Sequence, residues 1–155
     1  MTGMDITDEE LRIMAAKIGS DVPFCISGGC ARCRGRGEII SHLLPWDGLP
    51  VVIVRPEISV STSRAYMEAE HFPHIQQQAP EKISDAIGAR DMDAFCRSLR
   101  NDFEDFLFPV SQELAETKEY LEQFDRPVQM TGSGSAFFLL SVSGREAEHI
   151  VLQIK

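Results

Sequence analysis

The stretch Gly19-Ser20-Asp21-Val22-Pro23-Phe24 is a tight turn that ends one predicted helix and begins a predicted strand. Upstream, Thr7 and Glu10 form an S/T-x-x-E capping box, which is the signature of a helix start. Apolar residues then recur with helical spacing at Leu11, Met14, Ala15 and Ile18. Gly19 stands where a left-handed C-terminal cap residue is expected. The sequence therefore predicts a helix that stops at this turn, and the turn displays the carboxylate of Asp21.

Local chemistry gives Asp21 two interpretations. Its predicted place beside the negative end of a helix macrodipole is unfavourable for a carboxylate, which hints at a functional role. The alternative is an ordinary Asx turn, in which the carboxylate accepts hydrogen bonds from nearby backbone N–H groups. From local chemistry alone, the Asx turn is favoured.

Length, composition and charge limit the class of protein. The chain has 155 residues, enough for one domain or for one domain plus part of another, and 43% of them are hydrophobic, as in ordinary globular proteins. No apolar run approaches the roughly 20 residues of a membrane span, and the acidic N-terminus is unlike a signal peptide. A formal net charge of −9 argues against nucleic acid or an anionic membrane as a general partner. We therefore expect a cytoplasmic protein.

An arginine cluster follows the turn. Arg32, Arg34 and Arg36 would share one face of a strand, and that face could contact a phosphorylated ligand. A solvated strand face is the simpler interpretation.

Cysteine and histidine spacings invite a metal site. Cys30 and Cys33 could begin a zinc site with Cys25, but no second pair of ligands stands at a suitable spacing. His71 and His74 lie in a polar connection at 71–80, where we expect solvated loop histidines. The sequence therefore favours free thiols and no metal.

The remaining elements are predicted from periodicity and turn signals. Strands are expected at 24–26, 31–34, 51–54 and 136–141, and the run 51–54 has apolar residues on both faces, as in a strand buried within a sheet. Helices are expected at 64–70, 82–88, 91–100, 111–123 and after Gly144. Because Pro45-Trp46-Asp47-Gly48 has strong turn chemistry, a domain boundary is expected near residue 48.

A second glycine-rich stretch, Thr131-Gly132-Ser133-Gly134-Ser135, separates two apolar runs. It lacks the Walker pattern and is followed by Phe137-Phe138-Leu139-Leu140 without an obvious helix, so it is not a P-loop. Taken alone, the pattern is typical of a hairpin. Backbone N–H groups of such a loop can also face an anion.

These motifs together carry a resemblance. The stretch 19–24, followed by Gly28-Gly29, Gly35-Arg36-Gly37-Glu38, Asn101-Asp102-Phe103-Glu104 and the stretch 131–135, resembles the GHMP family of small-molecule kinases. Within that family it is similar to the kinases of isoprenoid precursor synthesis. The likeness covers nearly the whole chain, but it corresponds only to the later part of the family's pattern.

The resemblance implies specific roles. Asp21 would be the catalytic carboxylate, and Tyr66 would match the aromatic residue that stacks on the substrate's cytosine. Gly132, Ser133, Gly134 and Ser135 would line the phosphate side of the site, with Ser135 in place of the family's usual Pro. The implied reaction is ATP-dependent phosphorylation of the 2-hydroxyl of a cytidyl-diphospho-methylerythritol, with Mg²⁺ accompanying ATP. Asn101 receives no chemical role, since a helix cap would explain it.

Two parts of the family's pattern do not occur in this sequence. These are the catalytic Lys near the start and the glycine- and serine-rich loop that cradles ATP. We therefore expect little or no turnover from this chain alone. The alternatives are a non-catalytic module that binds a ligand or a protein, and a GHMP kinase with another substrate.

The expected architecture follows the same division. The resemblance implies an α+β fold in which 1–48 is the remnant of an N-terminal catalytic domain. Residues 50–155 would form the ferredoxin-like, two-layer C-terminal domain. Because strand edges would be exposed, a homodimer is expected.

Overall fold

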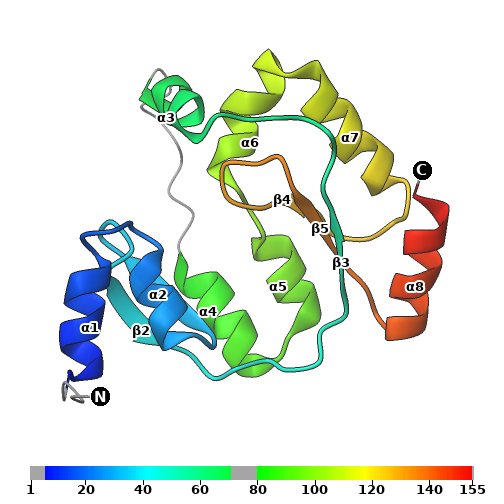
Figure 1. The fold of residues 1–155 in the computed structure, drawn as a ribbon. Coiled ribbons are helices and arrows are strands. Elements are labelled where there is room, and N and C mark those ends of the chain that lie inside the picture. Colours follow the sequence, from blue (N-terminus) through cyan, green and yellow to red (C-terminus); the bar gives the residue numbers. More distant parts are fainter. Residues whose placement is uncertain (1–5, 71–79, 155) are drawn as a thin grey trace, which may run out of the picture.

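The computed structural model describes residues 6–70 and 80–154 (Figure 1). The expected polar connection, with His71 and His74, lies almost entirely in 71–79, outside the described residues. The described part contains both helices and strands, arranged around two small antiparallel sheets. The expected α+β fold is therefore confirmed.

The N-terminal part holds two helices and a hairpin. Its elements are α1 (Asp8–Ala15), α2 (Val22–Ser27), β1 (Ala31–Arg34) and β2 (Ile39–His42). The capping box forms as predicted, because the Thr7 hydroxyl accepts the Glu10 amide at 3.2 Å and the Glu10 carboxylate accepts the Thr7 amide at 2.9 Å. β1 and β2 pair antiparallel, with Ala31 opposite His42.

Two predictions around the turn are wrong. Residues 24–26 belong to helix α2 and not to a strand, since Pro23 stands at the start of that helix, where its missing N–H costs nothing. Gly19 is not a left-handed cap: its φ is not positive, and α1 ends at Ala15. Ile18 and Gly19 both donate their amides to the Ala15 carbonyl, so the chain unwinds over several residues instead.

The C-terminal part contains the remaining elements. They are β3 (Val51–Val54), α3 (Thr62–Glu70), α4 (Pro80–Ala89), α5 (Met92–Ser98), α6 (Asp102–Leu107), the short 3₁₀ helix η1 (Phe108–Val110), α7 (Gln112–Glu122), β4 (Val128–Met130), β5 (Phe137–Leu140) and α8 (Gly144–Gln153). Side chains of Asp91, Asn101 and Ser143 cap α5, α6 and α8. The predicted helices are all present, with ends shifted by up to a few residues.

The second sheet has the order β3-β5-β4, and both pairings are antiparallel. β3 is therefore an edge strand among the described residues, and Ile53 is 73% exposed. The expectation that 51–54 is buried within a sheet is wrong, because only one face of the strand is covered. Val52, on that face, pairs with Leu139 and is 3% exposed.

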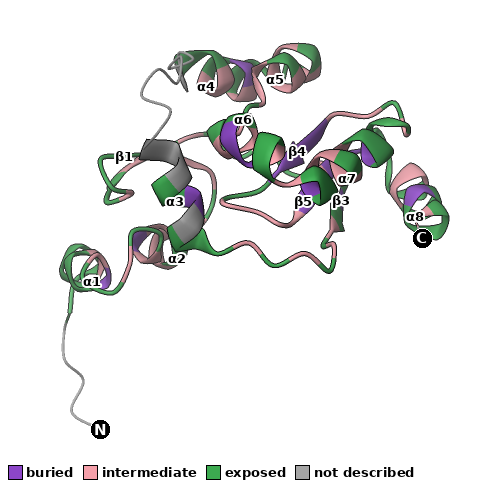
Figure 2. Ribbon diagram, turned by 90° about the horizontal axis from the view of Figure 1, so that it is seen from above, coloured by how far each residue is buried: buried purple, intermediate pink, exposed green. Residues whose placement is uncertain are grey.

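A single apolar cluster lies between the second sheet and the helices that cover it (Figure 2). The sheet contributes Val52, Val128, Met130, Phe137 and Leu139, and the helices contribute Ala65, Phe106, Leu107, Leu114, Leu121 and Ile150. The large fully buried side chains of this cluster come from β4, β5, α6 and α7. This core fixes the position of the loop between β4 and β5.

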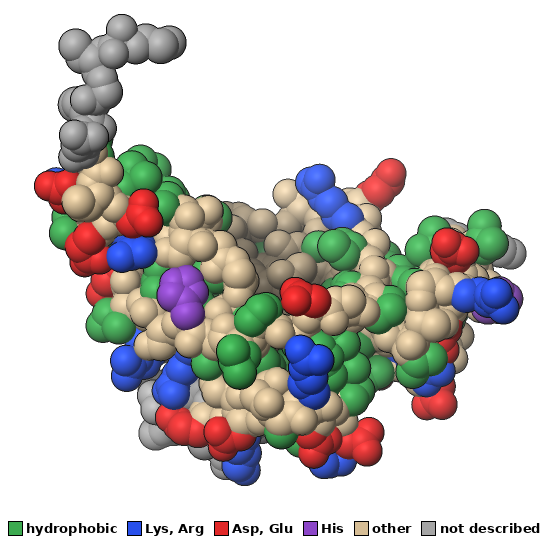
Figure 3. All heavy atoms as spheres, turned by 90° about the horizontal axis from the view of Figure 1, so that it is seen from below, with side chains coloured by type: hydrophobic (Ala, Val, Ile, Leu, Met, Phe, Trp, Pro, Cys, Tyr) green, Lys and Arg blue, Asp and Glu red, His purple; other side chains and the backbone are tan. Residues whose placement is uncertain are grey.

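The N-terminal part buries much less apolar surface. Of the apolar stripe predicted for the first helix, only Ala15 is buried, whereas Met14 and Ile18 are more than half exposed. An ion pair between Arg32 and Glu81 at 3.0 Å and a Trp46–Phe95 ring contact at 5.9 Å join this part to α4 and α5. On the face shown in Figure 3, basic side chains are interspersed with acidic ones.

Candidate functional site

Asp21 is the N-cap residue of α2, and its side chain is exposed. The carboxylate makes no capping hydrogen bond, and no other partner for it is found among the described residues. An Asx turn requires the carboxylate to accept a hydrogen bond from a nearby backbone N–H, so the structure does not support that alternative. Because Asp21 precedes the positive end of α2, its position is not electrostatically unfavourable, and the earlier hint from the helix macrodipole does not hold.

The tip of the β1–β2 hairpin packs against the turn that carries Asp21. Gly37 has a φ of +117°, and a Cβ built on it would lie 2.3 Å from the Ser20 carbonyl oxygen. The Glu38 carboxylate accepts the Arg36 amide at 2.6 Å and closes the tip locally. Two of the quoted motifs, 19–24 and 35–38, thus meet in space.

The glycine-rich stretch forms the connection between β4 and β5. Thr131 donates its amide to the Ala136 carbonyl at 2.8 Å, and Gly134 donates to the Thr131 carbonyl at 3.1 Å. The amides of Gly132, Ser133 and Ser135 have no partner among the described residues. The hairpin prediction is therefore confirmed, and the loop retains free N–H donors of the kind that bind anions.

Tyr66 lies on α3, and its side chain is 60% exposed. Its ring meets the ring of Phe103 edge-on, with 5.2 Å between centroids and 86° between planes. The Phe103 ring continues into the buried Phe106 ring by a second edge contact. Tyr66 is therefore supported by the core and leaves ring surface accessible to a planar ligand.

The structure brings Tyr66 and the glycine-rich loop together at the start of α3. The Thr62 hydroxyl, one helical turn before Tyr66, lies 3.1 Å from the Ser133 hydroxyl. In the described part of the chain no hydrogen bond or ion pair joins Asp21 to either of them, and Figure 1 draws α2 apart from the β4–β5 loop. Two of the three expected site elements are thus neighbours, and the third stands apart.

Sequence reasoning missed the residues that hold the loop. The Asn101 amide nitrogen donates to the carbonyls of Met130 at 2.7 Å and Gly132 at 2.8 Å. The Glu104 carboxylate accepts the Met130 amide at 2.7 Å and also bonds Lys118. The signal was the Asn-Asp-Phe-Glu segment itself, for which the sequence suggested only a helix cap.

The cysteines show no metal-site geometry. All four are free, and Cys25 and Cys33 are exposed. Within 6–70 and 80–154, no group of three or more His, Cys, Asp or Glu side chains is placed to hold a metal ion.

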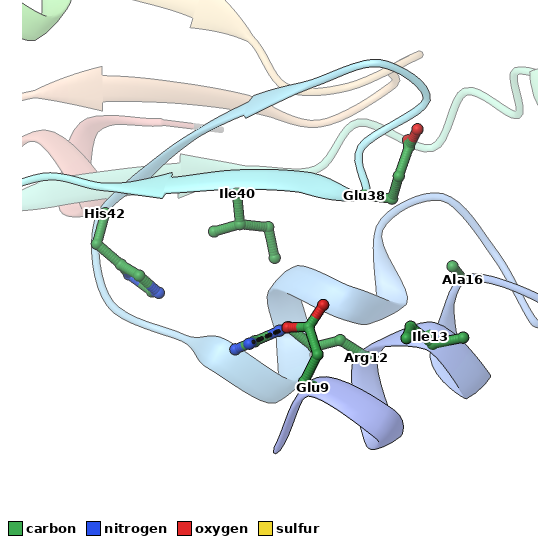
Figure 4. Close-up of a pocket in the computed structure, with 7 residues that line it drawn as sticks. All are labelled: Glu9, Arg12, Ile13, Ala16, Glu38, Ile40 and His42. Carbon is green, nitrogen blue, oxygen red and sulfur yellow. Dashed lines mark hydrogen bonds and ion pairs between the residues drawn. The ribbon is translucent and has the colours of Figure 1, made fainter. Parts of the chain in front are cut away.

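Two cavities lie away from the predicted site residues. One, of about 420 Å³, opens between α1 and β2, where the Glu9–Arg12 ion pair faces His42 and Ile40 (Figure 4). Another, of about 800 Å³, lies between the segment after β3 and α7 and is lined by acidic side chains such as Glu57 and Glu113. Neither includes Asp21, Tyr66 or the glycine-rich loop.

Comparison with known proteins places this geometry in context. Residues 83–155 match the family model described as GHMP kinases C terminal. Among curated proteins, 4-diphosphocytidyl-2-C-methyl-D-erythritol kinase of Synechococcus sp. (strain JA-3-3Ab) is 33% identical over an alignment of 150 residues, and the match covers 91% of this chain and 48% of that protein. The kinase of the same name from Clostridium acetobutylicum is 33% identical over 152 residues, with 97% and 54% covered.

A solved structure gives the same result. The crystal structure of 4-(cytidine 5'-diphospho)-2C-methyl-D-erythritol kinase matches with a TM-score of 0.73 and 27% sequence identity, and the match covers 96% of this chain and 53% of that one. The chain spans about half the length of the relatives it matches. In the described residues, no helix is both long and apolar enough to cross a membrane.

Proposed function

Because residues 83–155 match the C-terminal family model of GHMP kinases, we propose that the chain forms the cytidine- and phosphate-binding half of a small-molecule kinase of that family. The substrate is 4-diphosphocytidyl-2-C-methyl-D-erythritol, the compound named for its relatives. The observation that carries this proposal is the contact between the Thr62 and Ser133 hydroxyls, which joins a loop with free amides to the helix that carries the exposed Tyr66 ring.

The proposed chemistry is phosphoryl transfer to the substrate's 2-hydroxyl. Asp21 accepts the hydroxyl proton as the substrate oxygen bonds to the γ-phosphorus of ATP, and the bond from that phosphorus to the β–γ bridging oxygen breaks to release ADP. The free amides of the β4–β5 loop stabilise phosphate charge. Tyr66 holds the cytosine by stacking.

Mg²⁺ accompanies ATP and neutralises charge on its phosphates. The donor set of the β4–β5 loop, backbone amides flanked by hydroxyls, suits phosphate oxygens.

The domain division, the setting and the assembly are part of the same proposal. Residues 1–48 are the remnant of the catalytic N-terminal domain, and 50–155 form the C-terminal domain. The exposed apolar side chains on α1 and the edge position of β3 support self-association into a homodimer. Four free cysteines support a reducing, cytoplasmic setting.

Because positioning and charge stabilisation dominate phosphoryl transfer, we also expect the chain alone to be a poor catalyst. An isolated base is worth only about 10²- to 10⁴-fold. Purified chain should therefore show little ADP formation with Mg·ATP and the substrate. A turnover of roughly 1–10³ s⁻¹, typical of enzymes, would contradict this.

Substrate binding tests the central proposal. Isothermal titration of the wild-type chain with 4-diphosphocytidyl-2-C-methyl-D-erythritol should give measurable binding, which Tyr66→Ala weakens by about 5- to 150-fold, the cost of one base–aromatic stack. Tyr66→Phe keeps the ring and should bind like the wild type.

Two results would count against the proposal. Equal affinity of the wild type and Tyr66→Ala would remove the tyrosine from the site. Absence of binding by the wild type would leave the alternative of a non-catalytic module, and a separate titration with Mg·ATP shows whether any nucleotide site remains.

A further inference from the structure

Four carbonyl groups at the β4–β5 connection accept hydrogen bonds from the protein, whereas the amides of Gly132, Ser133 and Ser135 have no partner among the described residues. Within the loop, the Thr131 and Ala136 carbonyls accept from backbone amides. The Met130 and Gly132 carbonyls both accept from one side-chain nitrogen, that of Asn101. A loop that presented these carbonyl oxygens outward would repel an anion.

Asn101 can bind both carbonyls because the oxygen and the nitrogen of its side-chain amide both form hydrogen bonds. The oxygen accepts the Phe103 amide at 3.0 Å, which caps α6 and fixes which way the side-chain amide faces. The nitrogen then has two hydrogens, one for each loop carbonyl. A carboxylate or a single hydroxyl at this position would keep a cap but could not supply both bonds.

The tether to Gly132 also sets the direction of the next amide. In a trans peptide the C=O of one residue and the N–H of the next point in opposite directions. When the Gly132 carbonyl turns toward Asn101, the Ser133 N–H must point away from it. That amide has no partner among the described residues.

Glu104 holds the same strand from the next turn of α6. Its carboxylate accepts the Met130 amide at 2.7 Å and is itself paired with Lys118, and both side chains are less than one-fifth exposed. The two tethers bracket the residue where β4 ends and the loop begins. A partly buried ion pair therefore helps to fix the strand end to which Asn101 is bonded.

We propose that Asn101 is a positioning residue for phosphate: it binds the loop carbonyls and thereby aims the Ser133 amide at a phosphate oxygen. This inference rests on the proposed function for the identity of the anion, a phosphate ester of either the cytidyl substrate or ATP. Asn101 touches neither ligand itself.

Substitutions that keep the helix cap test the proposal. Asn101→Asp and Asn101→Ser both retain a cap for α6 but lose the paired donors, and the serine variant adds no charge. Each should weaken titrated binding of 4-diphosphocytidyl-2-C-methyl-D-erythritol or of Mg·ATP at least about tenfold, and the ligand affected identifies the phosphate source. Asp91→Asn is the matched control. It exchanges Asp for Asn, the reverse of Asn101→Asp, at the N-cap of α5, where the side chain accepts the Ala94 amide and is not bonded to the β4–β5 loop.

Hydrogen exchange of the loop amides gives a readout that needs no ligand. In both Asn101 variants the Thr131 and Gly134 amides should exchange faster, while the amides of α6 stay protected. Unchanged binding together with unchanged loop exchange would reduce Asn101 to a cap and overturn the proposal. If the wild type binds neither ligand, the proposed function and the phosphate role fall together, and exchange still decides whether Asn101 orders the loop.

Discussion

The Ser135 hydroxyl donates a hydrogen bond to the carbonyl of Ile58 at 2.6 Å, across 77 positions of the chain. This bond ties the end of the glycine-rich loop to the segment that leads from β3 into α3. A proline, which the resemblance leads one to expect at this place in the motif, could not donate such a bond. The serine thus attaches the end of the glycine-rich loop to the segment that precedes Tyr66.

Ser135→Ala should destabilise the chain by about 1 kcal/mol, because it removes this bond and leaves the Ile58 carbonyl without it. For a chain of this length that corresponds to a melting temperature lower by roughly 2–4 °C. Calorimetry measures this change in melting temperature. Ser59→Ala, an exposed serine next to Ile58, is the control and should melt like the wild type; equal melting of both variants would show that the bond contributes nothing.

Gly37→Ala should cost more than Gly48→Ala. Both glycines have a positive φ, +117° and +79°, but only at Gly37 would the added Cβ meet an atom, the Ser20 carbonyl oxygen at 2.3 Å. We expect about 1 kcal/mol for Gly48→Ala and roughly 2–4 kcal/mol for Gly37→Ala, since the hairpin tip or the Asp21 turn must shift. Urea unfolding measures both free energies, and equal values would mean that the tip moves away freely.

The sequence predicts best those features of the structure that depend on residues close together in the chain. The capping box at Thr7, the hairpin around residues 131–135 and the helix cap at Asn101 were predicted because each follows from residues a few positions apart. The strand predicted at 24–26 was wrong although its evidence was equally local. A short apolar run does not distinguish a strand from a helix, and Pro23 at the helix start decided it.

The site was less accessible to sequence reasoning. The roles of Asp21 and Tyr66 came from family resemblance and remain predictions. The Asn101 bonds to Met130 and Gly132 span 29 and 31 positions, and no local pattern encodes them. The edge position of β3 depends likewise on which strands pair with it, and its pairing partner β5 lies far along the chain.

The Glu104–Lys118 pair should be worth more than an exposed pair. The side chains are 12% and 19% exposed, and Glu104 also accepts the Met130 amide. Glu104→Gln leaves the lysine charge without its partner, so we expect a loss of about 2–3 kcal/mol, below the range for fully buried pairs. Asp105→Asn, which removes an exposed partner of Arg100, should cost less than about 1 kcal/mol. Similar losses for the two variants in urea unfolding would contradict this ranking.

Glu146 gives α8 a pH-dependent attachment. Its carboxylate is bonded to the Arg126 guanidinium, accepts the Ser141 hydroxyl at 2.6 Å and accepts the Val142 amide at 2.8 Å. These bonds, led by that to Arg126, lower the pKa of Glu146 from 4.5 to about 2. The helix start is thereby joined to the end of β5 and to the segment before β4.

The sign of the pH effect follows from that lowered pKa. The ionised form is favoured by folding, so its contribution is complete above the unfolded pKa of 4.5 and is lost as the pH falls through the folded pKa of about 2. The wild type should therefore be more stable than Glu146→Gln at pH 7, and the gap should shrink between pH 4.5 and 2. Urea midpoints across this range measure the gap. Glu148→Gln, an exposed change on the same helix, is the control and should give a smaller gap at pH 7. A gap for Glu146→Gln that stays constant down to pH 2 would show that ionisation of Glu146 does not stabilise the fold.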